Sequence, residues 1–430
     1  MEGITTGPKL TATLLDRGLA RQHPGEGWRF AHWLFREALE RHAQSHGRLE
    51  QHHRACADVL AERSDPGSDL RAAQHMLAAG DDDAALPPLL TAARRFAVTG
   101  AHRQGVTTLK TRRAAMDRLG LPEDHPERLE GQLIASYFAQ MIGSLDDGVA
   151  MAHRTADNAT GSLRIRGLQQ LARLRRDQGR LDEAGWLIAT AEAAATDALL
   201  LAHCRRDSAA VHLMRGDLAT AERDYRIALA GYQECGAERD RALAHKGLSR
   251  LKMKQGQFDE AIHHIEASRA LHARLGGRLG LAGCINAQGE IHRARGELDA
   301  AERCYRAALN NLQDTALSAE VITEINLALV LIARDQLVEA ETILVSGLAY
   351  FSQTGQQWMC ALLTAYRLPG LVTDQRWQDA ADSTKRALHL ARETGVKDAD
   401  AARLVQRALT GCTSQPGLTA AMSDLLSHHR

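Results

Sequence analysis

The chain has few aromatic residues and no excess of charge. Phe, Trp and Tyr make up 4% of its 430 residues, which is typical of helices that pack through small residues and not of an aromatic globular core. Its 53 basic residues balance 53 acidic ones. No global field therefore attracts the chain to nucleic acid or to an anionic membrane, and any recognition by charge has to be local.

Long apolar runs and paired cysteines are also absent. The first thirty residues lack the charged start and apolar run of a signal peptide, and no stretch of about 18 consecutive apolar residues occurs. The seven cysteines form no C-x-x-C pair, which argues against a disulfide framework or a zinc knuckle and favours buried thiols that pack between helices. These features predict a cytoplasmic protein without a membrane segment.

Motifs for nucleotides, metals and catalysis are missing as well. The sequence has no G-x-x-x-x-G-K-[ST] loop to cradle a triphosphate and no G-x-S-x-G elbow to hold a nucleophile. His42 and His46 lie four positions apart, but the glutamate of H-E-x-x-H is missing, so solvated surface histidines are the favoured interpretation. We expect no cofactor, no metal and no catalytic residue. An enzyme of unrecognised type is the least favoured alternative.

A repeated helical hairpin organises most of the sequence. Its turn residue recurs with gaps of 36, 37, 40, 40, 39 and 40 residues, at Gly143, Gly179, Gly216, Gly256, Gly296, Asp335 and Gln375. The helix after the turn carries a small residue in one fixed slot, at Ala184, Ala221, Ala261, Ala301, Ala340 and Ala380. A hairpin of this kind cannot bury its apolar stripe alone, so stacking against its neighbours supplies the missing surface. The period predicts an all-α solenoid.

The clearest copies resemble the tetratricopeptide repeat. Gln288-Gly289-x2-His292 in one helix and Ala301-x3-Tyr305-x2-Ala308 in the next carry the signature, with His292 in place of the usual aromatic residue. The resemblance implies a right-handed superhelix that binds a partner in its concave groove. Because the period here exceeds the usual value of about 34 residues, we expect longer helices or longer connections.

Residues 1–48 do not follow the repeat. A short helix from Leu10, two strands on either side of the turn at Pro24-Gly25, and a helix from about His32 to His46 resemble the end of a winged-helix module. Such a module follows the nucleotide-binding domain in large bacterial signalling ATPases with many domains. The resemblance implies that the chain is either a fragment of such a protein or a naturally shortened relative that starts inside the winged module. DNA binding by the wing is not favoured, because no recognition helix is identifiable.

The predicted organisation has three parts. Residues 1–48 are the partial winged segment, 49–410 the superhelix, and 411–430 a C-terminal capping helix with a frayed end. Proline breaks helix interiors, so we expect irregular points at Pro87-Pro88 and Pro369, and a bend in the loop of residues 120–127.

The first helix of each hairpin supplies the candidate binding residues. The resemblance implies that one of its faces lines the groove, and the polar residues on that face are Arg173, Arg206, Lys246, Arg250, Asn286 and Arg293. Arginine offers a planar fork that matches a carboxylate. The next copy contributes an apolar wall of Ile325, Leu329 and Ile332. A solvated basic face balanced by acids on neighbouring helices stays the alternative.

The sequence therefore predicts a protein-interaction or ligand-sensing scaffold. Its partner is a protein or peptide, with an acidic segment or a C-terminal carboxylate held in the groove, and neither membrane nor nucleic acid is expected. One interpretation places the array in a bacterial signalling ATPase or kinase. The alternative is a peptide-pheromone receptor of the helical-repeat kind.

Overall fold

The structure, a computed structural model, describes residues 8–23, 27–63, 67–312 and 317–430. The chain divides into two compact units. Unit 1 comprises residues 1–95 and 104–123, and unit 2 comprises residues 96–103 and 124–430. The division after Glu123 falls in the loop where the sequence predicts a bend. The predicted boundaries after residues 48 and 410 lie inside these units and stay predictions.

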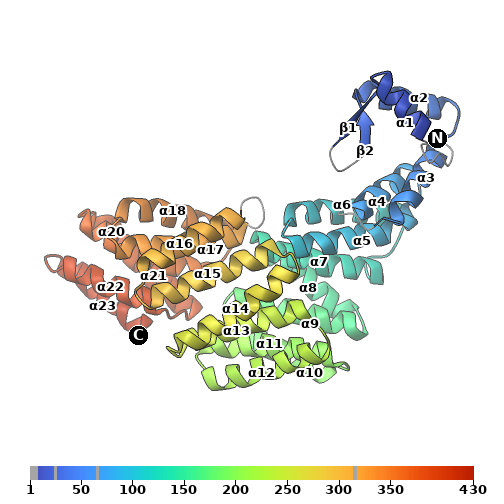
Figure 1. The fold of residues 1–430 in the computed structure, drawn as a ribbon. Coiled ribbons are helices and arrows are strands. Elements are labelled where there is room, and N and C mark those ends of the chain that lie inside the picture. The colour runs from blue at the N-terminus through green and yellow to red at the C-terminus, as the bar shows by residue number, and fades with distance from the viewer. Residues whose placement is uncertain (1–7, 24–26, 64–66, 313–316) are drawn as a thin grey trace. The chain divides into compact units, whose positions relative to one another are not determined.

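Unit 1 begins with the small winged segment expected from the sequence (Figure 1). The two strands are antiparallel and pair Ala20 with Phe30; the turn at residues 24–26 lies outside the described residues. The elements of unit 1, with α5 and α6 reaching into unit 2, are α1 (Pro8–Asp16), β1 (Ala20–His23), β2 (Gly27–Phe30), α2 (Trp33–Ser45), α3 (Leu49–Ala61), α4 (Ser68–Ala78), α5 (Asp82–Thr99) and α6 (His102–Arg118).

The expected interruption at Pro87-Pro88 is wrong, because α5 continues through both prolines. They lie in the second turn of the helix, where the missing N–H groups remove bonds only to carbonyls of the first turn. Leu86 and Leu89 are 3% and 0% exposed on either side of them, so burial holds the helix together at this point.

Unit 2 is a series of helical hairpins (Figure 1), as predicted. The first helix of each is α7 (Pro126–Ile142), α9 (Gly161–Asp177), α11 (Ala198–Arg215), α13 (Glu238–Lys254), α15 (Arg278–Ala294) and α17 (Leu317–Ala333). The second is α8 (Leu145–Asn158), α10 (Leu181–Ala194), α12 (Leu218–Glu234), α14 (Phe258–Arg274), α16 (Leu298–Leu312) and α18 (Leu337–Gln353). The helices from α13 to α15 have 17 residues each, so longer helices explain the 40-residue period.

The last two hairpins are less regular. In the first of them, a short first helix is broken at Arg367, so that α19 (Gln357–Tyr366) and α20 (Leu368–Thr373) precede α21 (Trp377–Thr394). Pro369 lies in the first turn of α20, which confirms an irregular point there. The final hairpin is α22 (Ala399–Gly411) with α23 (Pro416–His429). The expected frayed end is wrong, because α23 runs to His429, which is 4% exposed.

The predicted turn residues share one backbone conformation. All have a positive φ, from 57° at Gln375 to 88° at Gly143. Asp335 and Gln375 are the non-glycine residues with positive φ in the described part of the chain, and both occupy the slot that glycine fills in the other copies. A left-handed residue ends a helix and reverses the chain. The hairpin geometry therefore persists where glycine is lost.

The predicted small-residue slot is the tightest point of each hairpin. Its six alanines are at most 1% exposed. Across the hairpin, Ser249 on α13 donates to the carbonyl of Ala261 at 2.8 Å. A larger side chain in this slot would force the two helices apart, which costs about 1–3 kcal/mol in a packed core.

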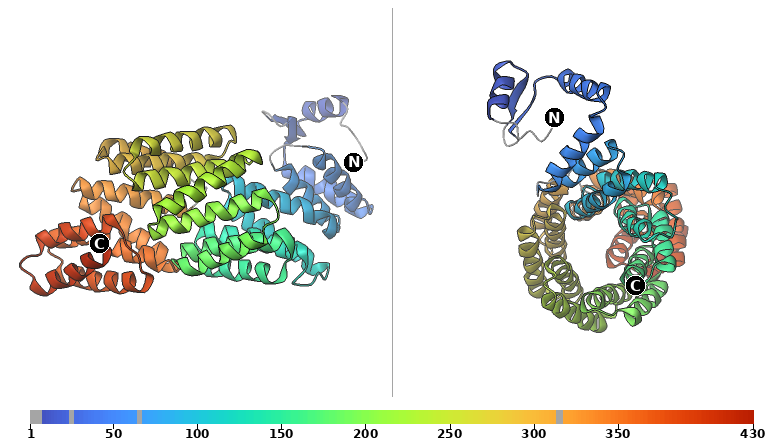
Figure 2. Two further views of the ribbon diagram at one scale, coloured as in Figure 1. Left: turned by 90° about the horizontal axis from the view of Figure 1, so that it is seen from below. Right: turned by 90° about the vertical axis from the view of Figure 1, so that its right-hand side faces the viewer.

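The hairpins of unit 2 form a superhelix, which looks circular along its axis in the right-hand view of Figure 2 and advances along that axis in the left-hand view, so that late helices come to lie against early ones. Ser318 Oγ donates to the carbonyl of Met141 at 2.6 Å, and Trp358 Nε1 donates to that of Asp177 at 2.6 Å. A Cβ at Gly143 would lie 2.5 Å from the side chain of Thr354, so this glycine allows the close approach. Hydrogen bonds therefore join successive turns of the superhelix in unit 2.

Candidate functional site

The predicted binding residues lie on faces that successive first helices turn toward one another. Gln169 on α9 donates to the carbonyl of Leu200 on α11 at 3.1 Å. Asn326 on α17 donates to Asn286 on α15 at 3.1 Å. Side chains on this face thus interact from one repeat to the next. Whether one of them is available to a ligand depends on whether the neighbouring helix supplies a hydrogen-bond or ion-pair partner.

Two of the predicted arginines are already paired with carboxylates. Arg173 lies 2.8 Å from Asp207, and Arg206 lies 3.1 Å from Asp207 and 3.0 Å from Asp240. Asp207 is 3% exposed. Each acid on the next helix lies 34 residues beyond the arginine that it pairs with, which is close to one repeat. These charges form a ladder between α9, α11 and α13.

The electrostatics of the ladder keep its acids ionised. Burial alone would raise the pKa of Asp240, but the imidazole of His203, 3.3 Å away, and the charge of Arg206 outweigh it and lower the pKa to about 2. Burial likewise opposes the charge of Asp207, yet Arg173 and Arg206 lower the pKa of its carboxyl. Arg173 and Arg206 are therefore neutralised within the chain.

Lys246 and Arg250 on α13 are in a different situation. Lys246 is half-buried and Arg250 is exposed, and no carboxylate of the described residues forms an ion pair with either. Burial lowers the pKa of Lys246, and the charge of Arg250 lowers it further. Lys254, one helical turn beyond Arg250, also has a lowered pKa through burial and Arg250. The three cations at four-residue spacing share one face of α13.

The neighbouring helix α15 makes room for these cations. A Cβ at Gly283 would lie 2.8 Å from the Nζ atom of Lys246, so the glycine leaves space for the ammonium group. Farther along α15, Asn286 donates to Glu290 at 2.8 Å, and Asn326 donates to the same carboxylate at 3.2 Å. Glu290 is thus bound by amides and not by the lysine.

Arg293, at the end of α15, forms a long-range pair. Its two terminal nitrogens lie 2.9 and 2.8 Å from the two carboxylate oxygens of Asp400 on α22. Burial opposes the charge of Arg293, but the bonds to Asp400 outweigh it and raise the pKa of the guanidinium. The residues are 107 positions apart.

The predicted apolar wall has to be corrected. Ile325, Leu329 and Ile332 are 4%, 8% and 2% exposed and belong to the hydrophobic core of the last hairpins. Ile325 packs on the backbone of Gly347, where a Cβ would lie 3.2 Å from its Cδ1. These side chains support helix packing, and we place no ligand against them.

Comparison with known proteins supports the repeat architecture. Residues 240–314 match the sequence profile described as tetratricopeptide repeat. The array is of the tetratricopeptide-repeat type. No curated protein matches the chain in sequence.

Solved structures share the fold of the tetratricopeptide array. A Rap protein complexed with competence and sporulation factor is 12% identical, with 80% of this chain and 96% of that chain covered and a TM-score of 0.59. NprR in complex with its cognate peptide NprX is 16% identical, with 79% and 98% covered and a TM-score of 0.50. At these identities the likeness concerns the fold alone.

A third structure matches along nearly the whole chain. It is a signal transduction ATPase with numerous domains from Pyrococcus horikoshii, which has a tetratricopeptide repeat sensor. It is 13% identical, and the match covers 98% of this chain and 58% of that chain with a TM-score of 0.46.

Three acidic partners in the tetratricopeptide array were not predicted from the sequence, namely Asp207, Asp240 and Asp400. The first two carried a signal, since each follows an arginine by 34 residues. Asp400 carried none, because its partner is remote in sequence. Lys254 was also missed, although it continues the spacing of Lys246 and Arg250 on α13.

Other predicted features concern sites outside the tetratricopeptide groove. Within the described residues, no group of three or more His, Cys, Asp and Glu side chains could hold a metal ion, and no helix combines the length and apolarity needed to span a membrane. Four cysteines are buried, as predicted, at positions 204, 284, 360 and 412; Cys56 and Cys235, by contrast, are exposed.

Proposed function

We propose that the tetratricopeptide array is a sensor module that binds a protein or peptide through an acidic segment or a C-terminal carboxylate. The observation that carries this proposal is the row of cations on α13. Lys246 and Arg250 have no carboxylate partner among the described residues, whereas Arg173 and Arg206 do. Carboxylates form charge-assisted hydrogen bonds with such groups. Asn286 and Arg293 border the same site on α15, and no catalytic role is assigned to any of these residues.

The superhelix of unit 2 supports an extended peptide over a folded partner. Hydrogen bonds from Ser318 and Trp358 join late hairpins to early ones, so successive turns of the superhelix lie in contact at these points. The Rap and NprR structures of the same fold hold competence and sporulation factor and the peptide NprX. Their content supports a peptide ligand for this chain too. Its winged segment supports a place in a signalling ATPase, with the array as the sensor part.

Calorimetric titration with hexaglutamate, a peptide that has side-chain carboxylates and a free C-terminus, tests the proposal. Changing Lys246 and Arg250 together to Glu should reduce the affinity tenfold or more, since each charge-assisted hydrogen bond contributes roughly 1.5–3 kcal/mol. The melting temperature should stay within a few degrees of the wild type. The affinity of the wild type should also fall with added salt, because screening acts over about 8–10 Å.

The matched control changes Lys385 and Arg386 to Glu. Both side chains are exposed on α21, so this variant reverses the same number of charges elsewhere in unit 2 and should bind like the wild type. Equal binding by the two double variants would show that the ligand uses another surface.

A further inference from the structure

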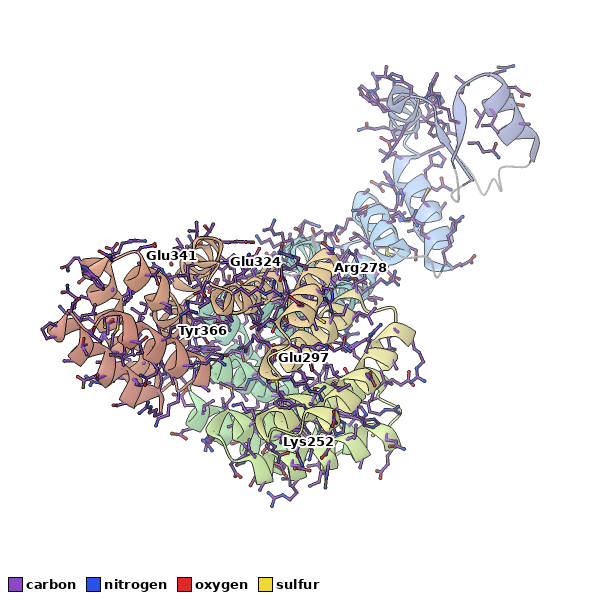
Figure 3. The ribbon with its side chains drawn as sticks, turned by 60° about the vertical axis from the view of Figure 1, so that its left-hand side comes forward. Lys252, Arg278, Glu297, Glu324, Glu341 and Tyr366 are labelled. Atoms are coloured by element: carbon purple, nitrogen blue, oxygen red, sulfur yellow. The ribbon has the colours of Figure 1, made fainter. Side chains whose placement is uncertain are left out.

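The first turn of α22 is held against other helices of unit 2 through its acidic residues. The carboxylate of Asp400 accepts hydrogen bonds from both terminal nitrogens of Arg293 on α15, at 2.9 and 2.8 Å. Asp398 accepts a hydrogen bond from the hydroxyl of Tyr366 on α19, at 3.0 Å. Tyr366 is 5% exposed, and Figure 3 labels it close to the C-terminal helices. The start of α22 therefore contacts helices from two earlier hairpins.

Asp400 contacts Arg293 in the way that a bound carboxylate ligand would. Two parallel N–H···O bonds join a guanidinium to a carboxylate, which is the arrangement that gives arginine its specificity for carboxylates. The two side chains are 17% and 19% exposed, so water screens the pair only partly. Arg403 on α22 also pairs with Asp400. A carboxylate thus fills the place that a ligand carboxylate would take on Arg293.

The broken helix at Arg367 precedes this contact. Tyr366 ends α19, and α20 begins at Leu368. Asp398 caps α22 by accepting the backbone N–H of Ala401 at 2.8 Å. The same carboxylate oxygen takes the hydroxyl of Tyr366, so the cap and the interhelical contact depend on one side chain.

We propose that the acidic first turn of α22 is an internal competitor for the ligand, with Asp400 bound to Arg293 in place of a ligand carboxylate. This inference rests on the proposed function, because it assumes that the ligand is acidic and reaches Arg293. The occupant that displaces Asp400 is an acidic peptide. When it binds, Arg293 exchanges one carboxylate for another, and the first turn of α22 is released.

Exchange avoids the main cost of opening such a pair. Removing one partner of a buried ion pair leaves an uncompensated charge, but an incoming carboxylate keeps Arg293 paired throughout. The rest of α22 stays attached, because Ala401, Leu404 and Val405 lie in the hydrophobic core. At its far end Arg407 donates to the carbonyl of Ile332 at 2.7 Å. Ligand binding would therefore loosen the start of the helix and leave its apolar face packed.

The test compares Asp400→Asn with Asp424→Asn in the full chain. Asp424 is exposed on α23, so its change removes the same charge from the same hairpin without touching Arg293. If Asp400 competes, Asp400→Asn should bind hexaglutamate about threefold tighter or more, since affinity falls in proportion to the fraction of competent molecules. Asp424→Asn should bind like the wild type.

Hydrogen exchange supplies a second readout. Saturating hexaglutamate should increase amide exchange in the first turn of α22 in the wild-type chain, which needs no substitution. Asp400→Asn should show that increase without peptide. In an Arg293→Gln background, Asp400→Asn should no longer raise the affinity, because both changes act on the same contact.

The outcomes separate the two proposals. Suppose that the wild type binds hexaglutamate, that the variant with Lys246 and Arg250 changed to Glu does not, and that Asp400→Asn binds no tighter than the wild type. The competitor is then refuted, and the proposed function stands. Unchanged exchange in α22 with bound peptide also refutes the competitor. If no variant binds hexaglutamate, both proposals fail.

Discussion

Basic residues in the same slots of the first helices have carboxylate partners in one part of unit 2 and none among the described residues in another part. Between α9 and α11, Arg173 and Arg206 share the buried carboxylate of Asp207. On α13, Lys246 and Arg250 have no such partner in the described chain. Residue type and slot are alike in both places, so they do not decide whether a charge is available to a ligand.

The difference comes from the residue that lies one repeat farther along. Asp207 follows Arg173 by 34 residues and lies 2.8 Å from it. Forty residues after Arg250 comes Glu290, but the amides of Asn286 and Asn326 occupy that carboxylate. A basic residue in a repeat array is structural when the next repeat neutralises it and free when the next repeat does not.

The largest expected effect comes from removing the shared carboxylate of the ladder. Asp207→Ala leaves Arg173 and Arg206 without their buried partner, which should destabilise the fold by about 3–5 kcal/mol. Arg250→Ala should leave the urea midpoint near the wild-type value, because no ion pair is lost. If the two variants had equal urea midpoints, the ladder would not stabilise the fold more than the unpaired cations do.

A change of pH should act on the ladder next. The pKa of Asp240 is lowered to about 2 from its ordinary value of 3.8, so its carboxylate stabilises the fold above pH 4, and the contribution is lost as the pH falls toward 2. It amounts to roughly 2 kcal/mol. The difference in unfolding free energy between wild type and Asp240→Asn should be present at pH 7 and vanish near pH 2. A difference that is independent of pH would argue against the ion pair.

Lys246 on α13 should also make the stability of the fold rise with pH, but at alkaline pH. The pKa of Lys246 is lowered by burial and by Arg250, so the unfolded chain holds its proton to higher pH than the folded chain does. Stability therefore rises with pH as Lys246 loses its proton, up to the ordinary value of 10.5. Lys246→Met should abolish this rise in urea titrations, and a rise that persists would have to come from another group.

The smallest expected effect tests the space beside Lys246. Gly283→Ala adds a Cβ at 2.8 Å from its ammonium and should lower the affinity for hexaglutamate by moving that group. Stability should not fall, since alanine favours a helix over glycine by up to about 1 kcal/mol. Gly417→Ala is the control, because a Cβ there meets no atom within 4 Å. Equal affinities would exclude Gly283 from the site.

The sequence was sufficient for the hairpins because their determinants are local and recur. The turn positions from Gly143 to Gln375 all have positive φ, and the alanine slot is buried in all six copies. Each signal appears several times at a known period, so a single departure such as Asp335 does not hide it. The two strands around residue 25 were also predicted, since a turn signal separates them.

The candidate site was less predictable because its state depends on partners in other helices. Spacing by one repeat could have revealed Asp207 as the partner of Arg173. Nothing in the spacing connects Arg293 with Asp400, because the two residues lie 107 positions apart in hairpins that do not follow one another in the chain. The burial of Ile325 likewise depends on helices α18 and α19, which pack beside it. The sequence pattern predicted a binding surface, but it did not predict which of the basic residues there lack a carboxylate partner.

The contact between successive turns of the superhelix also affects how the chain folds. In a solenoid without such contacts each repeat touches only its neighbours, so folding starts anywhere and the end repeats detach independently. Here the indole of Trp358 reaches a carbonyl 181 residues earlier in the chain, and Ser318 reaches one 177 residues earlier. Contacts of such sequence separation are slow to form unless the hairpins between them are already folded. They couple the stability of early and late hairpins that are otherwise far apart in the sequence.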